Sequence, residues 1–453
     1  MVFKSIDRKT GFLFPPSIDD WLPEAHLARF VVDVVSQLDL RPLMASYKEN
    51  GELAYPPSML LALLFYGYAT GTFSSRALER KTYDAVDFRY ISANTHPDHS
   101  TISAFRKRFL DDLQPLFLQI LSIAAEAGLL KLGTICLDGT KMKANASKHK
   151  ALSYKHACDL EKQLKTEVAQ LMKLAESADG SEIPDGMDLP EELKIRATRL
   201  SKIAAAKAEI ERRAAERYAD EQQQYDVKMK KRAGKSEKNG RKPGGRPPAP
   251  PVAGPRDKDQ VNLTDEESRI MPKSGGGFEQ AYNAQASVDA ESMMIVGVHV
   301  SQIPNDKNEL EPALSELDKI PSAVGEAQIL DADNGYFSQS NVEACETAGL
   351  SPHIAPGREK HHPDVMERFS DPEDCPPPEA DAVTRMRHRL KTPEGRRTYS
   401  LRKQVVEPVF GIIKSVMGFR QFMLRGFEQA KGEWTLICLA FNLKRMHKMA
   451  QIA

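Results

Sequence analysis

Apolar residues recur at helical spacing over the first third of the chain, from about Asp19 to Leu130. A spacing of three and four residues is typical of an amphipathic helix. The apolar residues Leu27, Phe30, Val31, Val34 and Val35 have this spacing. A second helix is expected after Pro56-Pro57-Ser58, where the sequence is so apolar that the helix should be buried almost all round. The pattern predicts an all-α N-terminal domain over residues 1–130.

Short apolar runs of β type replace the helical spacing after residue 130. The first run, Thr134–Leu137, ends at Asp138-Gly139, and the next one comes more than a hundred residues later. The expected strands cover residues 134–137, 281–289, 294–300, 327–330 and 353–356, and helices are expected over 309–320 and 338–348. Strands that alternate with helices predict a mixed α/β sheet with flanking helices, formed by residues 131–147 and 278–453.

The C-terminal part of this domain should be a loop followed by helices. Residues 357–395 are polar and rich in proline, which indicates a loop insertion. A helix is expected from Arg396 onward, and Pro408 should either bend it or stand in a first turn, because proline has no amide hydrogen. The segment Thr435–Met446 is amphipathic and should pack on the sheet.

A long insertion separates the first strand from the second. Residues 148–227 are rich in Glu, Lys, Ala, Gln and Leu at helical spacing, with a break at 180–190, and so predict a helical hairpin. Residues 228–277 are expected to be a basic flexible linker. Between residues 228 and 250 the only acid is Glu237, and the cations are Lys228, Lys230, Lys231, Arg232, Lys235, Lys238, Arg241, Lys242 and Arg246. This segment either binds a nucleic-acid backbone or only improves solubility.

The composition limits the class of protein. Lys and Arg number 63, as do Asp and Glu, so the formal net charge is zero. This balance excludes a uniformly basic nucleic-acid binder but leaves room for a local basic surface. The five cysteines are scattered without zinc-finger spacing, and no apolar run approaches the length of a membrane span. We therefore expect a soluble protein of the reducing cytoplasm.

One basic stretch lies in the helical domain. A helix capped by Ser100-Thr101 carries Arg106, Lys107 and Arg108, a combination that suits contact with DNA phosphates. The alternative is an ordinary solvated basic face. Two loop histidines just before it, His96 and His99, are better explained as structural or exposed side chains than as metal ligands.

Three acids follow the expected elements of the α/β domain. Asp138 and Asp333 come after strands, and Glu407 lies on the helix after Arg396. Asp138-Gly139 alone would be a common turn, but three acids that a sheet brings together can bind two Mg²⁺ ions. Mg²⁺ prefers carboxylate and water oxygens, and two such ions promote phosphodiester cleavage.

These residues stand in motifs that resemble bacterial insertion-sequence transposases of the DDE type. The motifs are Leu137-Asp138-Gly139-Thr140, Ala332-Asp333-Asn334-Gly335-Tyr336, and a third signature formed by Tyr399, Arg402, Lys403, Glu407 and Lys414. The resemblance extends to Thr101–Arg106, Asn262–Asp265 and Tyr282–Gln285. It implies an RNase H-like catalytic domain, with Asp138, Asp333 and Glu407 as catalytic residues and metal ligands.

Two positions leave alternatives open. Four residues separate Arg402 from Glu407 where the family has three, so either Arg402 or Lys403 takes the role of the family's arginine. Asp331 is two residues before Asp333 and remains an alternative second ligand. The resemblance implies that Tyr399, Arg402, Lys403 and Lys414 bind DNA, whereas a Lys403–Glu407 pair on a solvated face is the structural alternative.

The resemblance implies a DNA transposase. Such an enzyme would use two Mg²⁺ or Mn²⁺ ions to act as an endonuclease at insertion-sequence ends and then transfer the strand into target DNA. We expect a homodimer in a synaptic complex, in the bacterial cytoplasm and on the nucleoid when bound to DNA. The alternatives are an RNase H-like metal-dependent nuclease without strand transfer and a catalytically silent DNA-binding protein.

Overall fold

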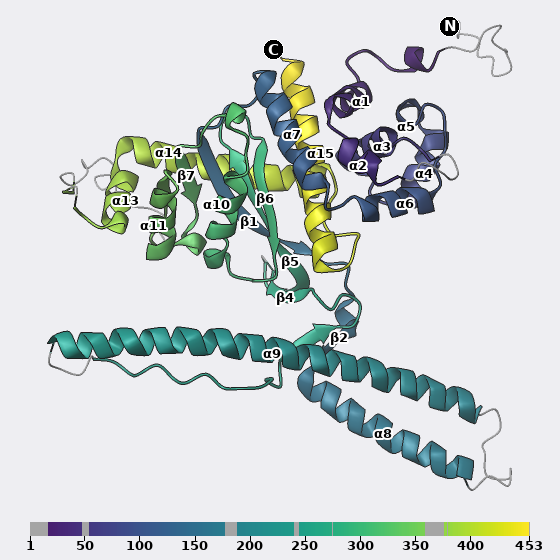
Figure 1. Ribbon diagram of the computed structural model, residues 1–453, viewed down its shortest axis with the longest axis vertical. Coiled ribbons are helices and arrows are strands. Elements are labelled where there is room, and N and C mark those ends of the chain that lie inside the picture. Colours follow the sequence, from purple (N-terminus) through teal and green to yellow (C-terminus); the bar gives the residue numbers. More distant parts are fainter. Residues whose placement is uncertain are drawn as a thin grey trace, which may run out of the picture. The chain divides into compact units, whose positions relative to one another are not determined.

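The computed structural model describes residues 17–47, 54–176, 188–239, 244–273, 275–357, 376–377 and 379–452 (Figure 1). The chain divides into two compact units. One unit combines Met1–Asn145 with Met271–Ala453, and the other is Ala146–Ile270. In the part of the chain that the structure describes, no helix is long and apolar enough to cross a membrane.

Helices occupy the chain before the sheet, as the apolar spacing predicts. They are η1 (Ile18–Trp21), α1 (Leu27–Gln37), α2 (Arg41–Ala45), α3 (Pro57–Ala69), α4 (Ser75–Asp84), α5 (Val86–Ile91), α6 (His99–Arg108) and α7 (Leu113–Glu126). Almost every residue of α3 is buried, which confirms the expectation drawn from its composition. These helices belong to the same compact unit as the sheet.

A mixed sheet forms the centre of this unit and confirms the expected α/β class. Its strands are β1 (Thr134–Lys143), β4 (Arg269–Pro272), β5 (Phe278–Asp289), β6 (Ile295–Ser301), β7 (Ile329–Ala332) and β8 (Ser351–Ile354). The order is β4-β5-β1-β7-β8, and β6 also pairs with β5. Strand β1 is antiparallel to β5 and parallel to β7, so it lies where the antiparallel and parallel parts of the sheet meet.

Helices cover the sheet and complete the core. They are α10 (Leu310–Leu317), α11 (Gln339–Thr347), α13 (Ala382–Lys391), α14 (Pro393–Gly411) and α15 (Phe427–Ala450), with a π-helical turn, η6 (Ile412–Val416), after α14. Leu137 and Leu330 of the sheet share a buried cluster with residues of α10, α11 and α13, among them Leu310, Val342 and Met386. Helix α15 lies beside α7 (Figure 1) and also contacts α3 and β6.

Several expected boundaries are wrong. Strand β1 continues to Lys143, so Asp138 lies inside the strand, because β5 pairs with this strand from Ile135 to Lys143. The expected loop over residues 357–395 contains α13 and the start of α14, although 358–375 and 378 lie outside the described residues. Pro408 is inside α14, four residues before η6 begins. The helix around Ser100 is capped by the side chain of Asp98.

The second unit contains the expected helical hairpin. Helix α8 (Tyr154–Glu176) pairs with α9 (Leu189–Asn239) through a shared apolar core and through ion pairs such as Lys207–Glu161 at 2.6 Å. The short strands β2 (Ala151–Ser153) and β3 (Gln260–Asn262) pair beside the hairpin. The prediction of a flexible linker from residue 228 is therefore wrong up to Asn239, where the basic segment continues α9.

A buried polar network joins the first helices to α15. The fully buried carboxylate of Glu433 accepts a hydrogen bond from the Tyr68 hydroxyl at 2.7 Å and others from the backbone amides of Met423 and Leu424. Arg106 donates to the Tyr68 hydroxyl at 3.0 Å and to a backbone carbonyl at 2.8 Å. Arg106 is only 7% exposed, so its guanidinium is not available for the phosphate contact that the sequence predicts.

We predict that Arg106→Met destabilises the protein by about 3 kcal/mol, because it removes the cation from a network that holds a buried carboxylate. The loss should appear as a lower midpoint of urea unfolding and a lower melting temperature. The control is Lys107→Met on the exposed side of the same helix, which should change the free energy of unfolding by at most about 0.5 kcal/mol. Equal effects of the two substitutions would contradict a structural role for Arg106.

Candidate active site

Two of the expected acids lie side by side at the meeting point of β1 and β7. The parallel register pairs Leu137 with Ala332, and the next residues along the chain are Asp138, still within β1, and Asp333, just past the end of β7. Strand β7 ends at Ala332, whereas β1 is still held by β5, with Asp138 opposite Ala286. Asp138 therefore occupies the position at which β1 loses its parallel neighbour and gains an open side.

The turn after β7 orients Asp333. This residue caps the short helix η5 (Asn334–Tyr336), and its Oδ1 accepts a hydrogen bond from the Gly335 amide at 2.7 Å. Asp138 makes a similar local bond, since its Oδ1 accepts from the Gly139 amide at 2.8 Å. Each of these bonds uses one carboxylate oxygen.

Burial makes Asp138 an electrostatically costly residue. Its side chain is only 20% exposed, and Arg402 Nη1 lies 3.3 Å from its Oδ2. Burial raises the pKa of Asp138 from the usual 3.8 to about 6; Arg402 and the Gly139 amide oppose this shift, while the charges of Asp333 and Asp306 add to it. A carboxylate among other carboxylates is stabilised by a cation, so the environment of Asp138 suits a bound positive charge.

Asp331 does not belong to this pair, because its carboxylate is bound to His353. Its side chain is fully buried, and its Oδ1 lies 3.0 Å from Nδ1 of His353 on β8. Asp333 follows the strand end and adjoins Asp138, whereas Asp331 pairs in register with Cys136. The geometry thus favours Asp333 over Asp331 as the partner of Asp138.

Helix α14 brings Arg402 to the acids and leaves Glu407 at its surface. Arg402 is buried, whereas Lys403 and Glu407 are both exposed. In the described part of the chain, α14 forms an ion pair through Arg402 with Asp138, and Lys403 and Glu407 are not paired with each other. Among the described residues, no group of three or more His, Cys, Asp or Glu side chains is arranged to hold a metal ion. The expected convergence of Glu407 on the two aspartates is therefore not seen.

The expected DNA-binding residues of the C-terminal signature differ in position. Lys414 lies in the π-helical turn, and its ammonium donates a hydrogen bond to the Thr140 hydroxyl, two residues beyond Asp138. Burial lowers the pKa of Lys414. Tyr399 is half-buried and interacts with Arg402. Lys403 remains exposed, so Arg402 neutralises an acid while Lys403 is accessible to a phosphate.

The basic stretch of α6 is less accessible than expected. The Asp98 carboxylate occupies the N-terminus of this helix, where it accepts hydrogen bonds from the amides of Ser100 at 2.7 Å and Thr101 at 3.0 Å. Arg108 is exposed but lies over the Tyr47 ring at 5.1 Å. Lys107 is exposed, so of the three cations it is the one left with its charge fully in solvent.

Sequence reasoning missed a further carboxylate, Asp306, in the short helix η3 (Asp306–Asn308). Its Oδ1 accepts hydrogen bonds from Lys141 at 2.9 Å, Asn283 at 2.7 Å and Gln285 at 2.9 Å. The signal in the sequence is the Tyr282–Gln285 segment of the resemblance, which contains Asn283 and Gln285, two of the donors to Asp306.

The donor set at this point suits a divalent cation. Asp138 lies within β1 and Asp333 just past the end of β7, and each uses its Oδ1 to accept a hydrogen bond from a nearby backbone amide, while Oδ2 of Asp138 faces Arg402. Oxygen donors of this kind are the ligands that Mg²⁺ and Mn²⁺ prefer. Asp138 and Asp333 therefore fit a metal ion, and Glu407 is not placed with them.

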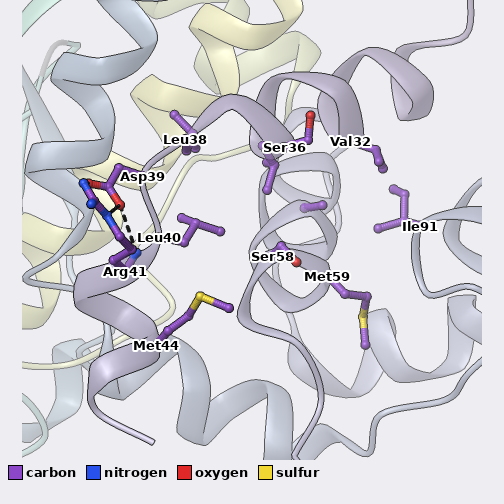
Figure 2. A pocket seen from close by; sticks show the side chains of 12 residues that line it. Val32, Ser36, Leu38, Asp39, Leu40, Arg41, Met44, Ser58, Met59 and Ile91 are labelled. Carbon is purple, nitrogen blue, oxygen red and sulfur yellow. Dashed lines mark hydrogen bonds and ion pairs between the residues drawn. The ribbon is translucent and has the colours of Figure 1, made fainter.

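The pocket shown in Figure 2 lies among the N-terminal helices and not at the acidic site. It has a volume of about 490 Å³, and the helices α1, α2, α3 and α5 contribute to its lining. Leu38, Leu40, Met44 and Met59 line it, and Asp39 pairs with Arg41 at 2.6 Å along one wall (Figure 2). None of its lining residues belongs to the acidic site.

Family models of two transposase domains match the chain. Residues 16–108 match the family described as Transposase domain (DUF772), and residues 377–447 match the family described as Transposase DDE domain. The second match includes all of α14, with Arg402 and Glu407, and Lys414 in η6. Neither a curated protein nor a solved structure matches the chain. The two family matches confirm the resemblance to insertion-sequence transposases of the DDE type.

We predict that Asp138→Asn stabilises the metal-free protein at neutral pH. Because the pKa of Asp138 is raised to about 6 in the folded chain, the ionised form is unfavourable above pH 6, and this cost disappears as the pH falls through 6 toward 4. At pH 7.5 the gain should be on the order of 2 kcal/mol. Melting curves in EDTA between pH 4 and 8 test this expectation, with exposed Asp318→Asn as the control. Equal stability of Asp138→Asn and the unaltered protein at pH 7.5 would contradict it.

Proposed function

We propose that this chain, which family models match over two transposase domains, is a DNA transposase that cuts DNA at the ends of an insertion sequence and joins them to target DNA. The observation that carries the proposal is the juxtaposition of Asp138 and Asp333 beside Arg402. Helix α14 supplies Arg402 and lies within the segment that matches the DDE domain.

Asp138 and Asp333 are the proposed metal ligands and catalytic residues of this reaction, with Glu407 as the third. Two Mg²⁺ or Mn²⁺ ions, when bound, supply activation of the attacking oxygen and neutralisation of the leaving oxygen. Glu407 projects from α14 into solvent in the protein alone, so in the proposal it joins the aspartates when DNA and cations are present. Arg402 orients the Asp138 carboxylate and limits the repulsion between the acids.

The cations around the acids are proposed to hold DNA phosphates. Lys414 lies beside Thr140, and Lys403 is exposed on the same helix as Glu407. Tyr399 and Arg402 support this surface, and exposed Lys107 and Arg108 of α6 are proposed to add backbone contacts. Phosphate contacts of this kind position DNA without reading its sequence.

The fold and assembly fit the same proposal. A mixed sheet with β1 at its centre, carrying the first acid, supports the RNase H-like domain that the family implies. Because two element ends must be brought together before transfer, we propose that a homodimer forms the synaptic complex.

A metal-dependent nuclease without strand transfer is the second candidate, and the paired aspartates favour it equally. A plasmid-target assay separates the two, because only a transposase joins a labelled end to the plasmid.

A silent DNA-binding protein is the third candidate. Addition of Mg²⁺ should not raise its melting temperature, since ligand binding stabilises only a protein that has a site.

We predict that Asp138→Ala and Asp333→Ala each reduce cleavage of end-containing DNA in Mg²⁺ by at least about a thousandfold, since each removes a carboxylate that would hold the cation. Glu407→Gln should reduce it to a similar extent. Cleavage products are mapped on end-labelled DNA taken from the sequence flanking the element. The control Glu394→Gln, an acid in the first turn of the same helix, should cleave normally. Normal rates in the three site variants would refute the assignment.

The C-terminal part of α9 is a second proposed DNA contact. Lys228, Lys230 and Lys231 are exposed on this helix, whereas Arg232 donates to a backbone carbonyl at 2.8 Å. Lys228 and Lys231 are one turn apart on the same side of the helix, and a DNA backbone carries one negative charge per ~1.7 Å of duplex. We propose that this basic segment adds affinity that does not depend on DNA sequence.

Replacing Lys228, Lys230 and Lys231 together with Gln should therefore flatten the salt dependence of DNA binding. The slope of log K against log salt concentration should fall by about 0.9 for each phosphate that the variant no longer neutralises. Fluorescence anisotropy with a non-specific duplex at several salt concentrations measures this slope. The matched control replaces Lys194, Arg199 and Lys202, three exposed cations in the N-terminal half of the same helix. An unchanged slope in the first variant would count against the proposed role of this segment.

A further inference from the structure

Asp306 is held more firmly than either proposed catalytic aspartate. One of its oxygens accepts three hydrogen bonds, from the Lys141 ammonium and from the side-chain amides of Asn283 and Gln285, at 2.7 to 2.9 Å. The Lys141 and Asp306 side chains are 21% and 28% exposed, so the pair is largely shielded from solvent. The donors come from β1 and β5, and Asp306 itself follows β6. One carboxylate thus ties together the three antiparallel strands.

Asp306 also packs against the glycines that follow the two catalytic aspartates. A Cβ added at Gly139 would lie 2.9 Å from Asp306 Oδ1 and closer still to Gln285 Nε2. A Cβ added at Gly335 would lie 2.8 Å from Asp333 Oδ1 and 3.8 Å from Asp306 Cβ. Real Cβ atoms essentially never approach other atoms closer than 3.0 Å. A larger residue at either glycine would therefore have to displace the side chains of Asp306, Gln285 or Asp333, which fill the space beside them.

The Gln285 side chain extends this connection to the turn that carries Asp333. Gln285 lies directly across the ladder from Gly139. Its Nε2 donates to Asp306, and its Oε1 accepts a hydrogen bond from the hydroxyl of Tyr336, the fully buried last residue of η5. The Gln285 backbone carbonyl accepts from the Trp434 indole at 2.9 Å. Gln285 cannot shift without disturbing β1 and the Asp333 turn together.

We propose that Asp306 is a positioning residue for the proposed metal-binding pair, an inference that rests on the proposed function. It sets the spacing between β1 at Asp138 and η5 at Asp333 through the amides of Asn283 and Gln285 and through the packing of the two glycines, while Lys141 supplies its counter-charge. Its charge also adds to the negative potential that acts on Asp138. Outer-sphere carboxylates of this kind orient ligand residues and strengthen metal binding without touching the ion.

The test is the affinity for Mn²⁺ of the full-length protein, measured from the electron paramagnetic resonance signal of the free ion. Asp306→Asn keeps the size of the side chain and removes its charge. It should weaken Mn²⁺ binding by about 10- to 100-fold, the usual cost of removing an outer-sphere partner. Asp318→Asn, at the exposed end of α10, should bind Mn²⁺ as the unaltered protein does. Unchanged affinity in Asp306→Asn would overturn the proposal.

Lys141→Met supplies the second variant and keeps the test decisive if Asp306→Asn does not fold. It removes the counter-charge of Asp306 but leaves both amide donors, so Mn²⁺ affinity should be unchanged or higher. A tenfold loss in Lys141→Met would overturn the proposal, because it would show that metal affinity depends on the Lys141 ion pair and not on the amide-bound Asp306 carboxylate. In end cleavage, Asp306→Asn should lower kcat and leave KM for DNA within about twofold, because the residue acts on the metal site and not on DNA binding.

Failure of the proposed function gives a different result. If the unaltered protein neither binds Mn²⁺ nor cleaves end DNA, the proposal of a metal-dependent reaction is wrong, and so is the proposed role of Asp306. If the unaltered protein does both and Asp306→Asn equals it, only the role of Asp306 is wrong.

Discussion

The pairing of β1 on both sides is the constraint on which the acidic site depends. Strand β5 holds β1 along its whole length, whereas β7 accompanies it only as far as Leu137. The end of β7 leaves an open side next to Asp138, and the chain turns there at Asp333. Two carboxylates are thereby forced together by backbone hydrogen bonds, which are far stronger in sum than the repulsion between two charges.

Charge balance around this pair explains the residues packed next to it. Asp138, Asp333 and Asp306 bring three negative charges into a partly buried region, and Arg402 and Lys141 return two positive charges. Burial raises the pKa of Asp138, and the charges of Asp333 and Asp306 add to this shift. A protein that keeps such an arrangement gives up stability in the absence of a cation, which is common where side chains serve chemistry and not packing.

Helix α15 connects the sheet to the N-terminal helices through buried hydrogen bonds. Its Trp434 binds the backbone of β5 at Gln285, and its Asn442 binds both backbone groups of Ile295 at the start of β6. Glu433 directly precedes Trp434, and its buried carboxylate accepts a hydrogen bond from the Tyr68 hydroxyl of α3. Buried polar groups need all their partners, so α15 holds the N-terminal helices and the sheet in one unit.

The sequence by itself determined the kinds of element, the α/β class and the identity of the acids. Periodic apolar positions and the strand and turn signals are local properties, so α1, α3, α10, α11 and the β5–β6 hairpin follow from them. The motifs around Asp138 and Asp333 are local as well, and the structure places these two acids together. Only the tertiary structure decided that β1 runs on past Asp138, because strand length depends on a partner far along the chain. It also decided that Arg106 is buried and that Asp306 joins the site, since burial and long-range hydrogen bonds leave no periodic trace in the sequence.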